Sequence, residues 1–403
     1  MRTALAFLMA VPLAFYSTAS AATISIDGSS TVYPISAAIA QRWQAEGRRT
    51  HVDVIFSGSS AGIRRLIAGE IDIANSSRPI KDSELEEAAS RGIHIIELPI
   101  AIDGLTVVVN RRNTFIDHLT VEELQQMWKP DSSVKTWADV RRGWPAEPIH
   151  FTAPGKDSGT FEYFTHAIVG TTKAQRIDAF TSEDDHALVQ KVASNPYAIS
   201  YFGWAYFLEN QAMLRAIPIA QGKGAAISPS ESTIIDGSYA PLSRPIFIYV
   251  NKERLDRPDL ADFLRYYLAQ LVNVVPDVGY VHFGSEAQRL VETRLANRST
   301  GSIFNGSGTG QSDIARVLRE DTAANAAPAK TAPVPTMTSA PVVRDAAAVE
   351  RLRAATLQLA RLTLTDDSTL GEIARLAEEV ATQARGLAAA AAPTTAIKSM
   401  VSP

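Results

Sequence analysis

Short apolar runs alternate with longer amphipathic stretches from residue 23 onward. Residues 24–26, 52–56 and 71–74 are rich in Ile and Val, as strands are, whereas 32–43 and 61–68 have apolar residues at helical spacing. This alternation is typical of α/β proteins with a parallel sheet. Further strand-like runs lie at 93–98, 105–110, 149–151, 199–202 and 246–250. The pattern therefore predicts an α/β fold with enough elements for two lobes.

The order of the runs also indicates where the chain passes between the lobes. The runs around 101–109 and 244–250 are candidates for crossovers, at which the chain leaves the first lobe and later returns to it. The first lobe would then be discontinuous. We assign residues 23–103 and 247–305 to the first lobe and residues 104–246 to the second.

The N-terminal residues have the pattern of an export signal. Residues 1–22 carry a basic residue, Arg2, an apolar run over 4–16 and small residues at 19–21. This is typical of a cleavable signal peptide. A membrane anchor is the alternative, but the apolar run is shorter than the roughly 20 residues that a spanning helix needs. We therefore expect a secreted, periplasmic protein that is not itself embedded in the membrane.

Composition narrows the classes of partner. The chain of 403 residues has no cysteine and a net charge of −4. Without cysteine it can form neither a disulfide nor the lipid-linked cysteine of an anchored protein. A mildly acidic chain lacks the positive electrostatic potential that attracts nucleic acid or an anionic membrane surface. We therefore expect no nucleic-acid partner. Any anion site must be built from local donors.

Beyond residue 304 the character of the chain changes. Residues 306–344 are rich first in Gly and Ser and then in Ala, Pro and Thr, which predicts a flexible linker. In residues 345–391, apolar positions recur at helical spacing and predict a helical hairpin. This extension is either a solvated tail or a small module for oligomerisation or partner docking.

Three segments rich in hydroxyl groups and glycine follow strand-like runs, where helices are predicted to begin. They are GSST at 28–31, SGSSAG at 57–62 and PGKDSGT at 154–160. A helix start has free N–H groups and a partial positive charge, and Ser and Thr add donors, so such points attract anions. Each segment alone could be an ordinary helix cap, but three at the carboxyl ends of strands predict an anion site. The candidate donors are Ser29, Ser30, Thr31, Ser59, Ser60, Ser158, Gly159 and Thr160.

Two charged residues near these segments are candidate ligand contacts. Arg78 and its neighbour Ser77 follow a strand-like run, and an arginine fork matches two oxygens of a phosphate. Arg78 could equally be a surface arginine held by a carboxylate. Asp157 could accept a hydrogen bond from a protonated oxyanion such as HPO4²⁻, which fully ionised sulfate cannot donate. Asp157 could instead cap the helix that begins near Ser158.

At these residues the chain resembles the phosphate-binding proteins of phosphate ABC importers. The resemblance covers most of residues 24–304 and rests on the segments IDGSSTVYPI, SGSSAGI, GEIDIANSSRPI, LPIAIDGLTVVVN, DSGTFEYF, SEDD, YFGWAYF and PLSRPIFIYVN. It implies the two-lobed Venus-flytrap fold of type II periplasmic binding proteins, here followed by an α-helical C-terminal extension outside the family pattern. It also implies that phosphate is held in the cleft between the lobes and passed to the permease subunits of an ABC importer.

The resemblance assigns ligand contacts to the hydroxyl-rich segments, namely Ser30, Thr31, Ser59, Ser60, Ser158, Gly159 and Thr160. The sequence departs from the family pattern at two positions. Ser77 stands where better-known members have an acidic residue, and Pro154 stands where they have an arginine. Arg78 and Asp157 are then expected to supply these charges from exchanged positions.

Other functions stay open on the sequence alone. A secreted phosphomonoesterase could use Ser158 as nucleophile, although the seven histidines form no close-spaced metal-ligand motif. A receptor for sulfate, molybdate or arsenate would share the fold, and a sensor could signal through the C-terminal hairpin. We expect a phosphate-binding transport protein that is not an enzyme and that uses no metal and no cofactor.

Overall fold

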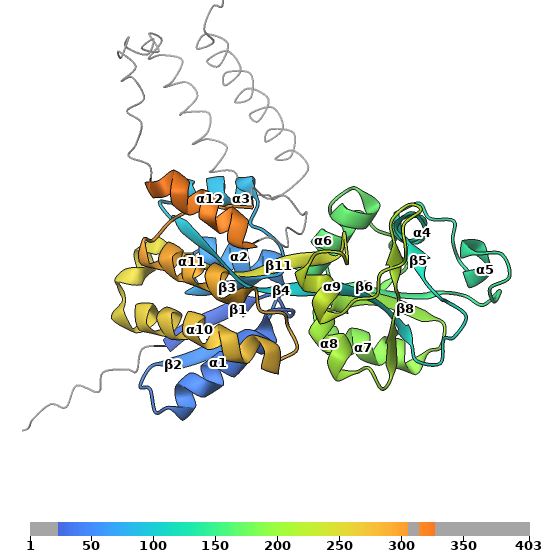
Figure 1. Cartoon of the computed structure of the whole chain (residues 1–403), viewed down its shortest axis with the longest axis horizontal. Helices are drawn as coiled ribbons and strands as arrows, with labels where there is room; N and C mark the ends of the chain where they lie inside the picture. Colours follow the sequence, from blue (N-terminus) through green and yellow to red (C-terminus); the bar gives the residue numbers. More distant parts are fainter. Residues whose placement is uncertain (1–22, 305–313, 327–403) are drawn as a thin grey trace, which may run out of the picture. The chain divides into compact units, whose positions relative to one another are not determined.

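The computed structural model describes residues 23–304 and 314–326, which are coloured in Figure 1. The predicted signal peptide at 1–22, the predicted hairpin at 345–391 and most of the predicted linker lie outside these described residues. Among the described helices, none combines the length and the apolar character needed to cross a membrane.

Helices and strands alternate in the first lobe from residue 23, as the pattern predicts. In α1 the apolar side chains of Ile35, Ile39 and Trp43 recur every four residues, so they share one face and are buried together. The first-lobe elements are β1 (Thr23–Gly28), α1 (Tyr33–Ala45), β2 (His51–Val54), α2 (Ser59–Ile67), β3 (Ile73–Ser76), α3 (Asp82–Ser90), the 3-10 helix η2 (Lys252–Asp256), α10 (Pro258–Asp277), α11 (Gly284–Ala296) and α12 (Ile314–Ala326).

The second lobe is formed by the middle of the chain. Its strands are short, and Trp128, Phe164 and Tyr201 pack together in its core, with Phe164 and Tyr201 stacked at 3.7 Å between ring centroids. Its elements are β5 (Leu119–Thr120), α4 (Val121–Trp128), α5 (Trp137–Val140), β6 (His150–Pro154), α6 (Gly159–Phe164), the π-helix η1 (Thr165–Val169), β7 (Phe180–Ser182), α7 (Asp185–Ser194), β8 (Ala198–Gly203), α8 (Trp204–Glu209), β9 (Leu214–Ala216), β10 (Ile219–Ala220) and α9 (Glu231–Ile235).

Two long strands, β4 (Ile95–Asn110) and β11 (Ser243–Asn251), connect the lobes (Figure 1). The sheet has the order β2-β1-β3-β11-β4-β8-β6-β7, and β9 also pairs with β4. β4 pairs antiparallel with β11 up to Gly104 and with β8 from Leu105 onward. β4 therefore pairs with strands of both lobes.

This strand corrects the expectation of two separate runs at 93–98 and 105–110. β4 continues through Asp103 and Gly104 without a break, and all its residues are buried. The charge of Asp103 is tolerated in mid-strand because Arg244 lies directly opposite it on β11 and pairs with it. The residues at which one lobe ends and the other begins stay a prediction.

Helix α12 corrects the predicted linker over residues 314–326. Ile314, Val317 and Leu318 have helical spacing and are buried where α12 packs against α11. Arg294 of α11 forms an ion pair with Asp321 of α12. The prediction of a linker followed the Gly/Ser-rich and Ala-rich composition around this segment and overlooked the spacing of its apolar residues, which is that of a short amphipathic helix.

We expect Leu318→Ala in the full chain to lower the free energy of unfolding by about 2–4 kcal/mol, because it leaves a cavity under α12. Glu320→Ala is the control, since Glu320 lies in an exposed ion pair with Arg316 on the same helix. Guanidinium unfolding of both variants is the measurement. Equal stabilities would show that α12 does not pack as described.

Candidate functional site

Hydroxyl groups from four segments meet between the lobes. The Oγ1 atoms of Thr31 and Thr160 lie 3.1 Å apart, and Ser77 Oγ lies 3.4 Å from Thr160 Oγ1. Ser59 Oγ extends the chain of contacts, 3.3 Å from Ser77 Oγ. All four side chains are buried. We call Thr31, Ser59, Ser77 and Thr160 the hydroxyl cluster; Thr160 belongs to the second lobe and the other three to the first.

Glycine at position 159 allows the lobes to approach each other here. A Cβ on Gly159 would lie 2.3 Å from Ser59 Oγ and 2.7 Å from Ser77 Oγ. At the end of β1, Gly28 has a φ of 135°, and a Cβ there would lie 2.1 Å from the carbonyl oxygen of Asn75. Gly159 is therefore needed for close packing at the hydroxyl cluster, and Gly28 for the close approach of β1 to β3.

A buried ion pair adjoins the cluster. Arg244 donates from Nη2 to Thr160 Oγ1 at 2.8 Å and to Asp103 Oδ2 at 2.9 Å. The second carboxylate oxygen of Asp103 accepts from the backbone N–H of Trp204 at 3.0 Å. The other terminal nitrogen of Arg244, Nη1, is buried and has no hydrogen-bond partner within the described residues.

This arrangement fits an oxyanion. A buried guanidinium nitrogen without a partner is costly, and an anionic oxygen would satisfy it. The hydroxyl cluster adds donors from both lobes, and Asp103 keeps lone pairs that can accept a proton of the ligand. The site is thus able to surround a small tetrahedral anion with donors and one acceptor.

Comparisons with known proteins agree with this geometry. A family model described as a PBP superfamily domain matches residues 16–270. Protein SphX of Synechocystis sp. is 40% identical over 301 residues, 74% of this chain and 89% of SphX. The phosphate-binding protein PstS of Staphylococcus aureus is 36% identical over 256 residues, 63% of this chain and 76% of PstS.

The chain belongs to the PstS family of phosphate-binding proteins. A solved structure of a possible phosphate binding protein from Planctomyces limnophilus also matches, with 41% identity and a TM-score of 0.54 over 70% of this chain and 99% of that one. The predicted family and the predicted type II periplasmic-binding-protein fold are confirmed.

Among the predicted site residues of this PstS-family chain, Thr31, Ser59, Ser77 and Thr160 form the cluster itself, and the backbone of Gly159 touches it. Ser158 caps α6: its Oγ accepts from the N–H groups of Thr160 and Phe161 at 3.1 and 3.4 Å. Its own hydroxyl proton is still available to a ligand. Ser29 forms part of the turn before α1, where its N–H donates to Asn75 at 2.9 Å.

Two predicted donors are occupied by carboxylates of the second lobe. Ser30 Oγ donates to Asp185 at 2.8 Å, and Ser60 Oγ donates to Glu162. Burial raises the pKa of Asp185 to about 7. Ser30 and Ser60 therefore connect the lobes, and their contact with the ligand stays a prediction.

Arg78 is held by carboxylates and does not contact the cluster. Its two terminal nitrogens donate to Glu84 at 2.7 and 2.9 Å, and Nη2 also donates to Ser60 Oγ at 2.9 Å. Burial opposes its charge, but Glu84 and Glu162 outweigh this and raise the pKa of Arg78. Arg78 is thus paired with a nearby carboxylate, as the alternative predicted, but it is buried rather than on the surface. Its contact with the ligand stays a prediction.

The ligand contact of Asp157 also stays a prediction, but its alternative role as a helix cap is wrong. Its side chain is 38% exposed and accepts from Arg64 at 3.0 Å, and the cap of α6 is Ser158 instead. The backbone explains this orientation, since Asp157 N–H donates to Glu183 and Asp157 C=O accepts from the N–H of Ser60. The carboxylate lies at the rim and pairs across the lobes.

Sequence reasoning did not single out Asp103 and Arg244, which adjoin the hydroxyl cluster, although both lie in segments that carry the family resemblance. A signal was present: each is a charged residue inside an otherwise apolar strand, AIDGL and LSRPIF. A charge buried in a strand needs a partner, and a pair of opposite charges in two such strands predicts contact between them.

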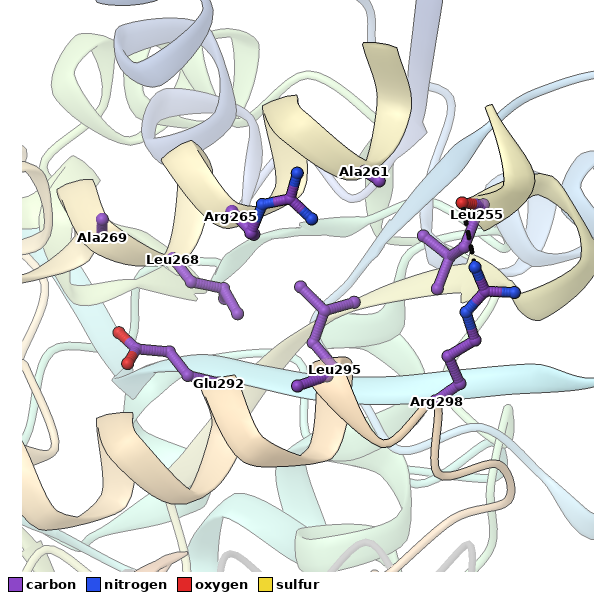
Figure 2. Close-up of a pocket in the computed structure, with 9 residues that line it drawn as sticks. Leu255, Ala261, Arg265, Leu268, Ala269, Glu292, Leu295 and Arg298 are labelled. Atoms are coloured by element: carbon purple, nitrogen blue, oxygen red, sulfur yellow. Dashed lines mark hydrogen bonds between the residues drawn. The ribbon is translucent and has the colours of Figure 1, made fainter. Parts of the chain in front are cut away.

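A separate groove of about 540 Å³ lies between α10 and α11 (Figure 2). Leu255, Leu268 and Leu295 line it, and Arg298 bonds to the backbone of Leu255 at 3.3 Å. None of its lining residues belongs to the hydroxyl cluster. Its apolar walls do not suit a small, strongly hydrated anion, so we do not assign it as the ligand site.

We expect Arg244→Met to lower the free energy of unfolding by about 3–5 kcal/mol, because it leaves the charge of Asp103 buried and unpaired. The double variant Arg244→Met with Asp103→Asn should recover part of this loss. Guanidinium unfolding of the single and double variants measures the coupling. Strictly additive losses would contradict a direct Asp103–Arg244 pair.

Proposed function

We propose that this protein captures inorganic phosphate between its two lobes and delivers it to the permease subunits of an ABC importer. The observation that carries the proposal is the buried hydroxyl cluster beside Arg244, whose Nη1 lacks a partner within the described residues. Membership of the PstS family supports the choice of phosphate as the anion.

Phosphate matches the chemistry of this site. Its ionised oxygens can accept from Thr31, Ser59, Thr160 and the free nitrogen of Arg244. Helix α2 begins at Ser59 without a side-chain cap, so its N-terminal dipole adds to the attraction. Because HPO4²⁻ carries a proton, Asp103 can accept a hydrogen bond from it, whereas sulfate would place bare oxygens against the carboxylate.

Capture would proceed by closure of the lobes. The ligand would touch hydroxyl groups of both lobes at once, since Thr31 and Thr160 are 3.1 Å apart. A ligand that gains contacts only in the closed state shifts the equilibrium toward that state. We place the first lobe at 23–103 and 247–305 and the second at 104–246, with β4 and β11 as the hinge between them.

An enzymatic role has less support than transport. A serine nucleophile needs a neighbouring base, but Ser158 Oγ acts as the cap of α6, and no histidine or carboxylate accepts its proton among the hydrogen bonds of the described residues. The relative PstS is named a phosphate-binding protein, and its name refers to binding rather than to a reaction. We therefore propose that the protein binds and releases phosphate unchanged.

We further propose that residues 1–22 are a cleaved signal peptide and that the mature protein works in the periplasm. The proposal rests on the basic, apolar and small-residue regions of this segment. The permease would recognise the surface that the two lobes form when they are closed around the ligand.

Titration calorimetry tests the proposed function. The protein, stripped of ligand by unfolding and refolding, should bind one phosphate tightly and reject sulfate, while arsenate should compete with phosphate. Asp103→Asn should weaken phosphate binding by about 10- to 100-fold and narrow the preference over sulfate, because the charged acceptor is lost. If the correctly folded protein binds no phosphate, the proposed function is wrong.

Proton uptake by Asp185 should make phosphate affinity depend on pH. Its closed-state pKa of about 7 lies above its ordinary value of 3.8, so closure is favoured by protonation. This contribution is complete below 3.8, declines as the pH rises toward about 7 and is absent above. The charged and titratable groups around it are Asp103, Asp184, His186, Tyr206, Arg244 and Tyr280.

Comparison with Asp185→Asn removes the titration of phosphate itself. The ratio of the two dissociation constants, wild type over variant, should rise from pH 4 to pH 7 by up to about tenfold per pH unit and then level off. Calorimetry across this range is the measurement. A ratio that does not change with pH would refute proton uptake at Asp185.

A further inference from the structure

Glu162 of α6 is a buried carboxylate, 1% exposed, and each of its two oxygens has a cationic partner. Oε1 accepts from Ser60 Oγ and lies 3.1 Å from Lys173 Nζ. Oε2 forms ion pairs with Lys81 Nζ and with Arg78 Nε, the latter at 3.2 Å. Burial alone would raise the pKa of Glu162, but Arg78 and Lys81 outweigh it and lower the pKa, so the group is a carboxylate at neutral pH.

Three of these four partners belong to the first lobe, whereas Glu162 belongs to the second. Ser60 lies in the first turn of α2, Arg78 follows β3, and Lys81 precedes α3. Arg78 is held in place within the first lobe by its two bonds to Glu84. The first lobe therefore presents a receptor for the carboxylate that does not depend on the second lobe for its position.

The fourth partner, Lys173, is in the second lobe and has a φ of 65°, a left-handed conformation that is uncommon outside glycine. Its N–H donates to Thr165 Oγ1 at 2.8 Å. A hollow of about 460 Å³, lined by residues of both lobes that include Lys81, His166 and Lys173, adjoins Glu162. Solvent therefore reaches the outer side of this contact between the lobes.

The residues of this contact are close in sequence to residues of the hydroxyl cluster. Ser60 directly follows the cluster residue Ser59, and Glu162 is two residues beyond the cluster residue Thr160. The same approach of α6 to α2 thus forms both the ligand site and the partners of Glu162. Separation of the lobes would break both together and leave Glu162 with Lys173 alone.

We propose that Glu162 is a positioning residue for phosphate capture, which holds the closed state through Ser60, Arg78 and Lys81 of the first lobe and thereby slows release of the anion. The inference rests on the proposed function, since it assigns a role in that same site. Glu162 does not touch the ligand. It acts through the equilibrium between open and closed lobes, so its removal changes release far more than capture.

The test is the release of radiolabelled phosphate into an excess of unlabelled phosphate, with the association rate measured by rapid filtration. Glu162→Gln should speed release by about tenfold or more and change association by less than about threefold, because the loss of contacts made only after closure appears in the dissociation rate. Lys81→Met, which removes a side chain that is 35% exposed, should speed release to a smaller extent.

Glu87→Gln is the control. It removes an exposed carboxylate of α3, which pairs with Arg91 in the same lobe and is not a partner of Glu162. Release from this variant should stay within about threefold of wild type. Equal release rates for wild type, Glu162→Gln and Lys81→Met would overturn the role of Glu162 while leaving phosphate capture intact. Failure of the wild type to bind phosphate would instead overturn the proposed function and this inference with it.

Discussion

The Asp103–Arg244 pair is the interaction on which the rest of the site depends. The two residues lie opposite each other on β4 and β11, the strands that connect the lobes, and β4 pairs with strands of both lobes. Both are fully buried, so neither charge can be left without the other. The pair therefore stays at the hinge in both the open and the closed state. It provides a cation and a hydrogen-bond acceptor at a fixed place, and the hydroxyl groups of the lobes join them on closure.

The hydroxyl-rich loops divide their neighbouring residues between two tasks. In the first loop, Thr31 faces the cluster while Ser30 bonds to Asp185; in the second, Ser59 faces the cluster while Ser60 bonds to Glu162. One residue of each pair is thus available to the ligand and the next fastens the loop to a carboxylate of the opposite lobe. These two carboxylates differ in electrostatics: Asp185 has few cations near it and its pKa is raised, whereas Glu162 is surrounded by cations and its pKa is lowered. Closure can therefore depend on pH through Asp185, while the ion pairs of Glu162 stabilise the closed state at neutral pH.

Sequence reasoning predicted the α/β alternation and the hydroxyl-rich loops because both follow from local patterns. Strand ends, glycines and helix starts are visible in a few consecutive residues, and Thr31, Ser59, Ser77 and Thr160 were all among the predicted contacts. The direction of a charged side chain is not local. Arg78 and Asp157 stand beside the right motifs, but Glu84 and Arg64 determine where they point. Asp103 and Arg244 are 141 residues apart, and only the strand pairing brings them together.

The most direct test of this account is a crystal structure of the protein grown with phosphate. The account predicts one phosphate between the lobes, within hydrogen-bond distance of the hydroxyls of Thr31, Ser59 and Thr160, with Arg244 Nη1 donating to it and Asp103 close to its protonated oxygen. Glu162 should keep its bonds to Ser60 and Lys81 in that structure. A phosphate bound instead by Arg78 and Asp157, away from Arg244, would contradict the central claim.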